Sequence, residues 1–214
     1  MKTGLTLEQL AAEITRQQSA KEDYVVNTGN LRLESYGPEL TLRVLDSDGA
    51  DRIEPLEIGD IAHRQIGTHL SIPAKYYERM RSEDPGLLAH NVNTWLERTP
   101  AQRMIRVLDG KARAYLSNRY LRMDNYSIAS AVLPILAEIP DVRIESCQIT
   151  DSRMYIKAVN PRLQEDVTPG DPVQAGVVIS NSEVGLGSVN IQPLIYRLVC
   201  SNGMVVNDAA TKRN

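Results

Sequence analysis

The first residues of the chain place hydrophobic side chains at helical spacing. Leu7, Leu10 and Ile14 would lie on one face of a helix. Thr6 precedes them, and a threonine hydroxyl in this position can accept a hydrogen bond from a backbone N–H of the first turn. The pattern therefore predicts a helix that begins at Thr6 and ends near Lys21.

The next part of the chain predicts strands first and helices afterwards. Residues 22–38 show no regular period and predict irregular structure, whereas 40–45 and 53–58 have the apolar content of two strands joined by a turn. From 59 to 98 the hydrophobic positions return to helical spacing, interrupted by prolines. A strand pair followed by short helices is expected.

The second half of the chain combines one helix with several strands. Asp124 can cap an apolar helix that runs to about Glu138, with Pro134 as a kink. The stretch 160–172 is rich in turn residues and predicts a loop or a boundary. Strands are expected at residues 142–149, 154–159, 173–180, 188–191 and 194–200.

Hairpins with helices inserted between them predict an α+β fold with a largely antiparallel sheet. The 214 residues are enough for one large domain with its own core. We expect a single domain over residues 1–214, with a helix-rich part at 25–100 and a hairpin and sheet part at 101–206.

The segment 102–123 predicts a hairpin around Asp109-Gly110, a dipeptide typical of two-residue turns. Pairing the strands across this turn sets Arg106 opposite Arg113. Side chains alternate between the two faces of such a hairpin. The face suited to a core would carry Ile105, Val107, Ala112, Ala114 and Leu116. The face suited to water or to a polyanion would carry Arg106, Lys111, Arg113 and Tyr115.

The same segment concentrates positive charge. It holds six basic residues and one acidic residue, in a chain whose formal net charge is −3. Cations with interleaved Tyr rings are what a single-strand nucleic-acid groove uses, although a solvated face of an ordinary hairpin is an alternative. The candidate nucleic-acid-binding residues are Arg103, Arg106, Lys111, Arg113, Tyr115, Arg119, Tyr120 and Arg122.

Residues 61–80 have the apolar spacing of a helix-turn-helix. Gly67 would lie where two helices cross, Ser71 would occupy the turn, where glycine is usual, and Pro73 would begin the second helix. Such helical hairpins also pack for purely structural reasons. In a unit that reads duplex DNA, the residues offered to the major groove would be Lys75, Tyr76 and Arg79.

Catalytic and metal-binding motifs are absent from the sequence. His63, His69 and His90 form no H-x-x-x-H pattern, and no G-x-S-x-G elbow or phosphate-binding lysine motif occurs. We therefore expect no enzyme, no catalytic residues, no metal and no cofactor. Cys147 and Cys200 form no disulfide framework, and no stretch has the length of a membrane span, so a cytoplasmic protein is expected.

Three stretches resemble a known family: QIGTHLSIPAKYYERM at 65–80, LSNRYLRMDNYSI at 116–128 and VVISNSEVGLGSVNIQPLIYRLVCSNGMVV at 177–206. They are similar to phage- and plasmid-borne proteins whose domain is described only as domain of unknown function 932. The resemblance spans most of the chain from about residue 25 and transfers no catalytic residue.

Family members usually continue past the C-S-N-G turn, so the resemblance implies a chain shortened at its C-terminus. It also implies a role in DNA maintenance, recombination or defence, and the order of elements looks similar to that of single-strand annealing recombinases.

The leading hypothesis is a non-enzymatic phage or plasmid protein that binds or anneals single-stranded DNA on the basic hairpin as a homo-oligomer. The apolar strands expected within 173–200 would suit pairing with another subunit. One alternative is a protein-interaction module that docks an acidic partner, which the acidic net charge favours. Another is a duplex DNA binder that uses residues 61–80.

Overall fold

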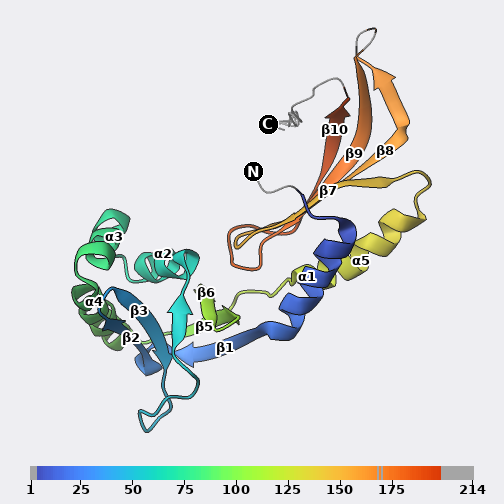
Figure 1. Cartoon of the computed structure of the whole chain (residues 1–214). Coiled ribbons are helices and arrows are strands. Elements are labelled where there is room, and N and C mark those ends of the chain that lie inside the picture. The colour runs from blue at the N-terminus through green and yellow to red at the C-terminus, as the bar shows by residue number, and fades with distance from the viewer. Residues whose placement is uncertain (1–3, 168, 170, 199–214) are drawn as a thin grey trace. The chain divides into compact units, whose positions relative to one another are not determined.

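The structure, a computed structural model, describes residues 4–167, 169 and 171–198. It divides into two compact units, one of residues 16–122 and one formed by residues 1–15 together with 123–214 (Figure 1). We name them the 16–122 unit and the 123–214 unit. Each has its own sheet and its own hydrophobic core. The helices and predominantly antiparallel strands confirm the expected α+β class.

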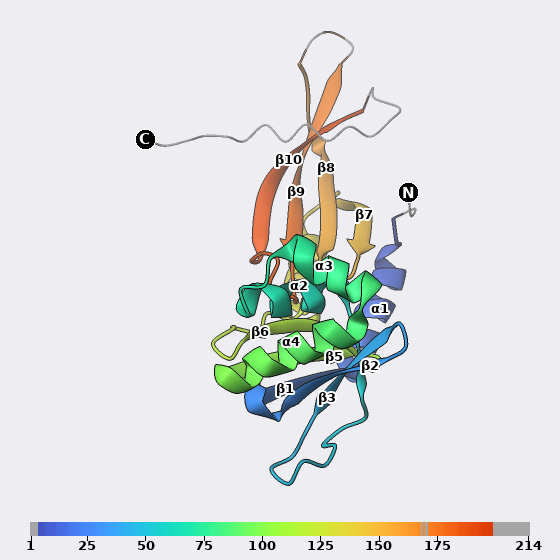
Figure 2. The same cartoon turned by 90° about the vertical axis from the view of Figure 1, so that its left-hand side faces the viewer.

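The 16–122 unit is a mixed sheet covered by helices on one face (Figure 2). Its elements are β1 (Lys21–Asn27), a 3-10 turn (Thr28–Asn30), β2 (Leu31–Tyr36), β3 (Glu39–Val44), β4 (Leu56–Ile58), α2 (Asp60–His69), α3 (Ala74–Glu83), α4 (Pro85–Arg98), β5 (Gln102–Leu108) and β6 (Lys111–Ser117). The strand order is β1-β5-β6-β4-β3-β2. Strands β4 and β6 run parallel, and the other neighbours run antiparallel.

The expectation of irregular structure over residues 22–38 was wrong, because β1 and β2 occupy most of that range. Leu31 and Leu33 of β2 are buried against the core, and Glu34 lies on the opposite face with Arg43 of β3. Charged side chains on that open face hide the alternation from a search for apolar runs. The strands are stabilised by one buried face and by pairing, which do not require a hydrophobic run.

The 123–214 unit is an antiparallel sheet with helices packed on one face. Its elements are the first half of α1 (Leu7–Ala20), α5 (Asn125–Glu138), β7 (Arg143–Ile149), β8 (Met154–Asp166), β9 (Pro172–Asn181) and β10 (Asn190–Arg197). The strand order is β10-β9-β8-β7. Thr6 caps α1 as predicted: the backbone N–H of Gln9 donates to the Thr6 hydroxyl at 3.2 Å, and Gln9 accepts from the Thr6 N–H at 3.0 Å. Leu10 and Ile14 of α1 and Ile128 of α5 share one core with the sheet.

Two predictions in this unit were wrong, one of a loop and one of two separate strands. Residues 160–172 do not form a loop throughout, because β8 continues to Asp166 and pairs with the start of β9. Leu163 on this extension of β8 is 61% exposed. The extension is therefore held by backbone pairing with β9 and not by burial of an apolar face. The separate strands expected at 188–191 and 194–200 are one strand, β10, which tolerates Pro193 because an edge strand does not need every N–H for pairing. Cys200 lies outside the described residues.

Candidate nucleic-acid interface

The basic hairpin is confirmed, and so is its turn. Asp109 and Gly110 adopt φ values of 53° and 73°, the left-handed pair that a type I′ turn requires. The hairpin lies inside the six-stranded sheet, however, with β5 between β1 and β6, and β6 between β5 and β4. Consecutive residues Met104 to Val107 are all buried, which means that neither face of β5 is a solvated basic surface.

Arg106 does not face solvent, contrary to expectation. Its side chain is fully buried and forms an ion pair with Asp23 of β1, in which Nε lies 2.9 Å from Oδ1. A β-bulge after Arg106 shifts the register, so that Arg106 pairs with Ala114 and not with Arg113. The repulsive arginine pair expected from simple hairpin pairing is therefore avoided.

Tyr115 is buried as well, so it cannot act as an exposed stacking platform. The bulge aligns it with Ile105 and turns it towards the helices, where it joins the core. Its hydroxyl lies 2.9 Å from Nδ1 of His69, at the end of α2. The guanidinium of Arg103 lies 5.6 Å from the centre of the Tyr115 ring.

The remaining hairpin candidates differ in exposure. Lys111 forms an ion pair with Glu57 of β4, and Arg122 lies 3.5 Å from Asp23. Arg119 is exposed, whereas Arg113 and Tyr120 are half-buried. Asp23 and Glu57 are far from the hairpin in sequence, and their carboxylates reduce the net positive charge that the local sequence suggested.

The helical hairpin at residues 61–80 is confirmed. Helices α2 and α3 meet at a turn in which Ser71 takes a positive φ of 56°, the conformation for which glycine is usual. A Cβ on Gly67 would lie only 2.9 Å from the Tyr77 ring, so the small residue is required where the helices cross. The expected duplex-reading residues Lys75, Tyr76 and Arg79 are exposed on α3, and Arg79 pairs with Glu83 in the same helix.

An open groove lies between the α2–α3 turn and α4, with a volume of about 530 Å³; we name it the α2–α4 groove. Two exposed aromatic rings line it, Tyr76 at 48% and Trp95 at 43% exposure. The full lining is His69, Leu70, Ser71, Ile72, Pro73, Tyr76, Met80, Asn91, Trp95 and Thr99. Of these, only Tyr76 was a candidate from the sequence.

Trp95 could not be singled out from the sequence. It follows Leu88 by seven residues and Val92 by three, which is the spacing of the buried stripe of α4, so the hydrophobic period predicts a core position. The structure leaves its ring largely exposed, and a large exposed ring on a helix is a common mark of a binding surface. His69 carried no signal either, because its contacts come from the distant hairpin.

The electrostatics of the α2–α4 groove favour an electron-rich or anionic ligand. No carboxylate occurs among the described residues that line it. The Arg98 guanidinium lies 5.4 Å from the centre of the Trp95 ring. Burial and the nearby positive charge of Arg103 lower the pKa of His69 below its usual range, so its imidazole is neutral at pH 7.

A second groove, of about 800 Å³, has the opposite character. Glu39, Glu57 and Glu78 line it together with Arg81 and the buried His63. His63 Nδ1 lies 2.9 Å from the Tyr77 hydroxyl, and burial lowers the pKa of His63 to about 4. This carboxylate-rich groove is unsuited to a polyanion, in contrast to the α2–α4 groove.

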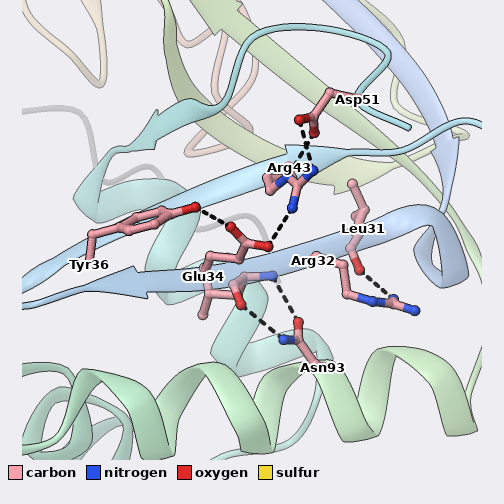
Figure 3. A network of polar contacts seen from close by, with 8 residues as sticks. Leu31, Arg32, Glu34, Tyr36, Arg43, Asp51 and Asn93 are labelled. Carbon is pink, nitrogen blue, oxygen red and sulfur yellow. Dashed lines mark hydrogen bonds and ion pairs between the residues drawn. The ribbon is translucent and has the colours of Figure 1, made fainter. Parts of the chain in front are cut away.

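The open face of β2 and β3 carries a closed polar network (Figure 3). Arg43 donates to Glu34 at 2.6 Å and through two nitrogens to Asp51 at 2.7 and 2.8 Å, while Tyr36 donates to Glu34. The hydrogen bonds from Tyr36 and Arg43 hold the pKa of Glu34 below its usual range. Because two carboxylates, Glu34 and Asp51, pair with the one cation Arg43, this network offers no net positive charge to a nucleic acid.

Asn93 of α4 protects the outer strand of the same sheet. Its side-chain amide accepts a hydrogen bond from the Leu33 N–H at 2.8 Å and donates to the Leu33 carbonyl at 2.9 Å (Figure 3). An edge strand whose backbone groups are satisfied in this way is a poor template for pairing with another chain.

Comparison with known proteins identifies one family. Residues 114–214 match the model described as domain of unknown function DUF932. The match includes the stretches at 116–128 and 177–206 that suggested this family, and it confirms the resemblance to this domain over those residues; the stretch at 65–80 lies outside it. The α2–α4 groove lies outside the matched residues. No curated protein and no solved structure matches the chain.

Within the DUF932 match, the S-N-S-E stretch holds the start of α5. The Glu183 carboxylate accepts the backbone N–H of Asn125 at 2.6 Å, and the Asn181 amide donates to the Met123 carbonyl at 2.8 Å. Asn181, Ser182 and Glu183 are all at least nine-tenths buried. A carboxylate at a helix N-terminus is stabilised by the helix dipole, so a structural role accounts for this stretch.

Two further properties concern membrane spanning and metal binding. Among the described residues, no helix is long and apolar enough to cross a membrane. In the same part of the chain, no group of three or more His, Cys, Asp and Glu side chains could hold a metal ion.

Proposed function

We propose that the chain binds single-stranded nucleic acid without catalysing a reaction, and that a base lies in the α2–α4 groove. One observation carries the proposal: Tyr76 and Trp95 expose their rings in an open groove whose described lining has no carboxylate. Stacking of a base on an aromatic ring typically contributes about 1–3 kcal/mol and tolerates any base. This is the nucleic-acid-binding function expected from the sequence, but we place its principal site at the helices α2–α4 and not at the β5–β6 hairpin.

The cations that would contact phosphates are at the margin of the groove. Arg98 already lies over the Trp95 ring, and Lys75 is exposed next to Tyr76 in α3. In the hairpin, by contrast, Arg106 and Lys111 have carboxylate partners. Exposed Arg119 remains a candidate for a further phosphate contact.

Strand annealing or protection by a homo-oligomer of a phage or plasmid remains part of this proposal. It is supported by the family resemblance and by the exposed Ile191 and Ile195 on the edge strand β10. Duplex reading through Lys75, Tyr76 and Arg79 is a competing mode on the same helix. Single-strand binding is favoured because stacking in the groove requires an unpaired base.

A protein-interaction module is the second candidate function. The specific observation in its favour is the apolar part of the groove lining, Leu70, Ile72 and Met80, which could accept an apolar side chain of a partner. Docking of an acidic partner on the hairpin has less support, because Arg106 is buried and Lys111 is paired.

Fluorescence anisotropy with a labelled oligothymidylate and a duplex of equal length tests the proposal. We expect the single strand to bind more tightly and the affinity to fall as salt rises. Trp95→Ala and Tyr76→Ala should each weaken binding by about 1–3 kcal/mol, whereas Tyr126→Ala, a matched change at an exposed tyrosine on α5, should have no effect. If Trp95→Ala and Tyr76→Ala bind the single strand as tightly as the control Tyr126→Ala, the groove is not the binding site. A duplex preference with sensitivity at Lys75 and Arg79 would support the competing mode.

A further inference from the structure

Asn91 places an oriented carboxamide in the wall of the α2–α4 groove. The residues that α4 contributes to the lining, Asn91, Trp95 and Thr99, follow one another at a spacing of four, so they share the face of the helix that borders the groove. Asn91 is half-buried and lies one helical turn from the exposed Trp95 ring, with roughly 5–6 Å between the Cβ atoms. In α3, Met80 lies one turn from Tyr76 in the same way.

A hydrogen bond to Met80 fixes the orientation of this amide. Asn91 Nδ2 donates to Met80 Sδ at 3.1 Å, and both residues line the groove. A thioether sulfur accepts hydrogen bonds and cannot donate them, so the nitrogen of the amide, and not the oxygen, must face it. One N–H is thereby engaged. The second N–H and the oxygen Oδ1 make no hydrogen bond within the part of the chain that the structure describes.

Other polar groups of the lining are already engaged. The Thr99 hydroxyl donates to the Trp95 carbonyl at 2.8 Å. Nδ1 of His69 lies 2.9 Å from the Tyr115 hydroxyl. A carboxamide, in contrast, offers a donor beside an acceptor in one plane. An asparagine amide pairs in this way with adenine, whose N6 amino group donates and whose N7 accepts.

We propose that Asn91 is the base-reading residue of the α2–α4 groove, and that it selects adenine by presenting Oδ1 and its second N–H to the N6 and N7 edge of a ring stacked on Trp95. This inference rests on the proposed function, because it names the base that the groove prefers. Tyr76 and Trp95 stack on any base, so a preference has to come from a polar contact. Met80 is a positioning residue, which keeps the amide from rotating.

Oligonucleotides with a single base test the selection by fluorescence anisotropy. Each carries one central base and is abasic elsewhere, so that only this base can enter the groove. The central base is adenine in the first strand, purine without the N6 amino group in the second, and 7-deazaadenine without the N7 acceptor in the third. A net hydrogen bond is worth about 0.5–1.5 kcal/mol, so the parent should bind the adenine strand about 2- to 12-fold more tightly than either of the others.

Substitutions separate base reading from a structural role of Asn91. Asn91→Leu keeps the approximate size and removes the polar group, so it should abolish the preference for adenine while the purine strand still binds. Met80→Leu removes the sulfur acceptor and should reduce the preference. His90→Leu, at the next and exposed position of α4 outside the groove lining, is the matched control and should keep it.

The outcomes separate this inference from the proposed function. Equal binding of the three strands by the parent, with binding lost in Trp95→Ala, would reject reading by Asn91 and retain the groove. This comparison needs no variant at Asn91, so it decides even where Asn91→Leu does not fold. A preference for adenine that survives in folded Asn91→Leu would overturn the inference. Failure of these strands and of oligothymidylate to bind would reject the nucleic-acid function and the inference with it.

Discussion

At the scale of single residues, ionisable side chains take their properties from partners that are remote in sequence. Arg106 is an exposed cation in a local hairpin pattern and a buried ion pair in the fold, because β1 brings Asp23 beside it. His63 and His69 carry no motif, yet each lies beside a tyrosine hydroxyl. Local sequence identifies such residues but not their protonation or accessibility.

Replacing Arg106 by Glu should destabilise the fold and not simply weaken binding. The change places a carboxylate against Asp23 in a site where the Arg106 side chain is fully buried. Breaking a buried ion pair typically costs about 3–5 kcal/mol. Denaturant unfolding measures the loss, and Arg119→Glu, at an exposed position in the same segment, should change stability by less than about 0.5 kcal/mol. Equal stability of the two variants would contradict the buried pair.

His63 should make stability depend on pH. Burial lowers its pKa in the folded protein to about 4, below the ordinary 6.5, so the unfolded chain binds the proton more tightly. The stabilising contribution is complete above pH 6.5 and is lost as pH falls from 6.5 to 4, by up to about 3 kcal/mol. The unfolding free energy of His63→Gln should fall less over this window than that of the parent. Exposed His90→Gln should behave like the parent, and identical slopes in all three proteins would contradict the buried histidine.

At the scale of elements, hydrophobic period and turn chemistry predicted much of the fold. The cap at Thr6, the Asp109-Gly110 turn and the helix crossing at Gly67 were predictable because each depends on neighbouring residues. Strands β1 and β2 were missed because their open face is charged. The bulge after Arg106 was missed because simple pairing across the turn assumes a regular register, and this error assigned Tyr115 to the wrong face; in the fold its hydroxyl lies beside His69 of α2.

The start of α5 should depend on Glu183. Its carboxylate accepts the Asn125 N–H at the first turn of the helix. Glu183→Ala should destabilise the protein by about 1–2 kcal/mol, and Glu183→Gln by less, since the amide keeps an acceptor but loses the favourable charge. Glu138→Ala, an exposed change at the opposite end of α5, is the matched control and should cost nothing. Thermal or denaturant unfolding measures these changes in the free energy of unfolding. A loss of stability in Glu138→Ala but not in Glu183→Ala would contradict the role of Glu183 at the start of α5.

At the scale of the whole molecule, the two units contribute different surfaces. The 16–122 unit holds the α2–α4 groove, and the DUF932 match covers the sheet of the 123–214 unit. In that sheet, the edge strand β10 exposes Ile191 by 62% and Ile195 by 55%. Apolar edge strands are suited to pairing with another chain.

We therefore expect self-association through β10. Ile191→Lys together with Ile195→Lys should reduce the oligomer mass without changing the affinity of a subunit for a short oligonucleotide, because the groove is in the other unit. Light scattering at micromolar concentration measures the mass, and Leu163→Lys, on the exposed extension of β8, is a matched control. A monomeric parent, with and without DNA, would remove annealing by an oligomer.

The central claim is that a base stacks on Trp95, and the chain's only tryptophan reports on this contact directly. Intrinsic fluorescence should be measured while oligothymidylate is added at low salt, with no label or substitution. Stacking predicts saturable quenching of the tryptophan emission, reversed by added salt as the phosphate contacts weaken. An emission that stays unchanged while an independent anisotropy titration shows binding would place the nucleic acid elsewhere. Absence of binding in both measurements would contradict the nucleic-acid function itself.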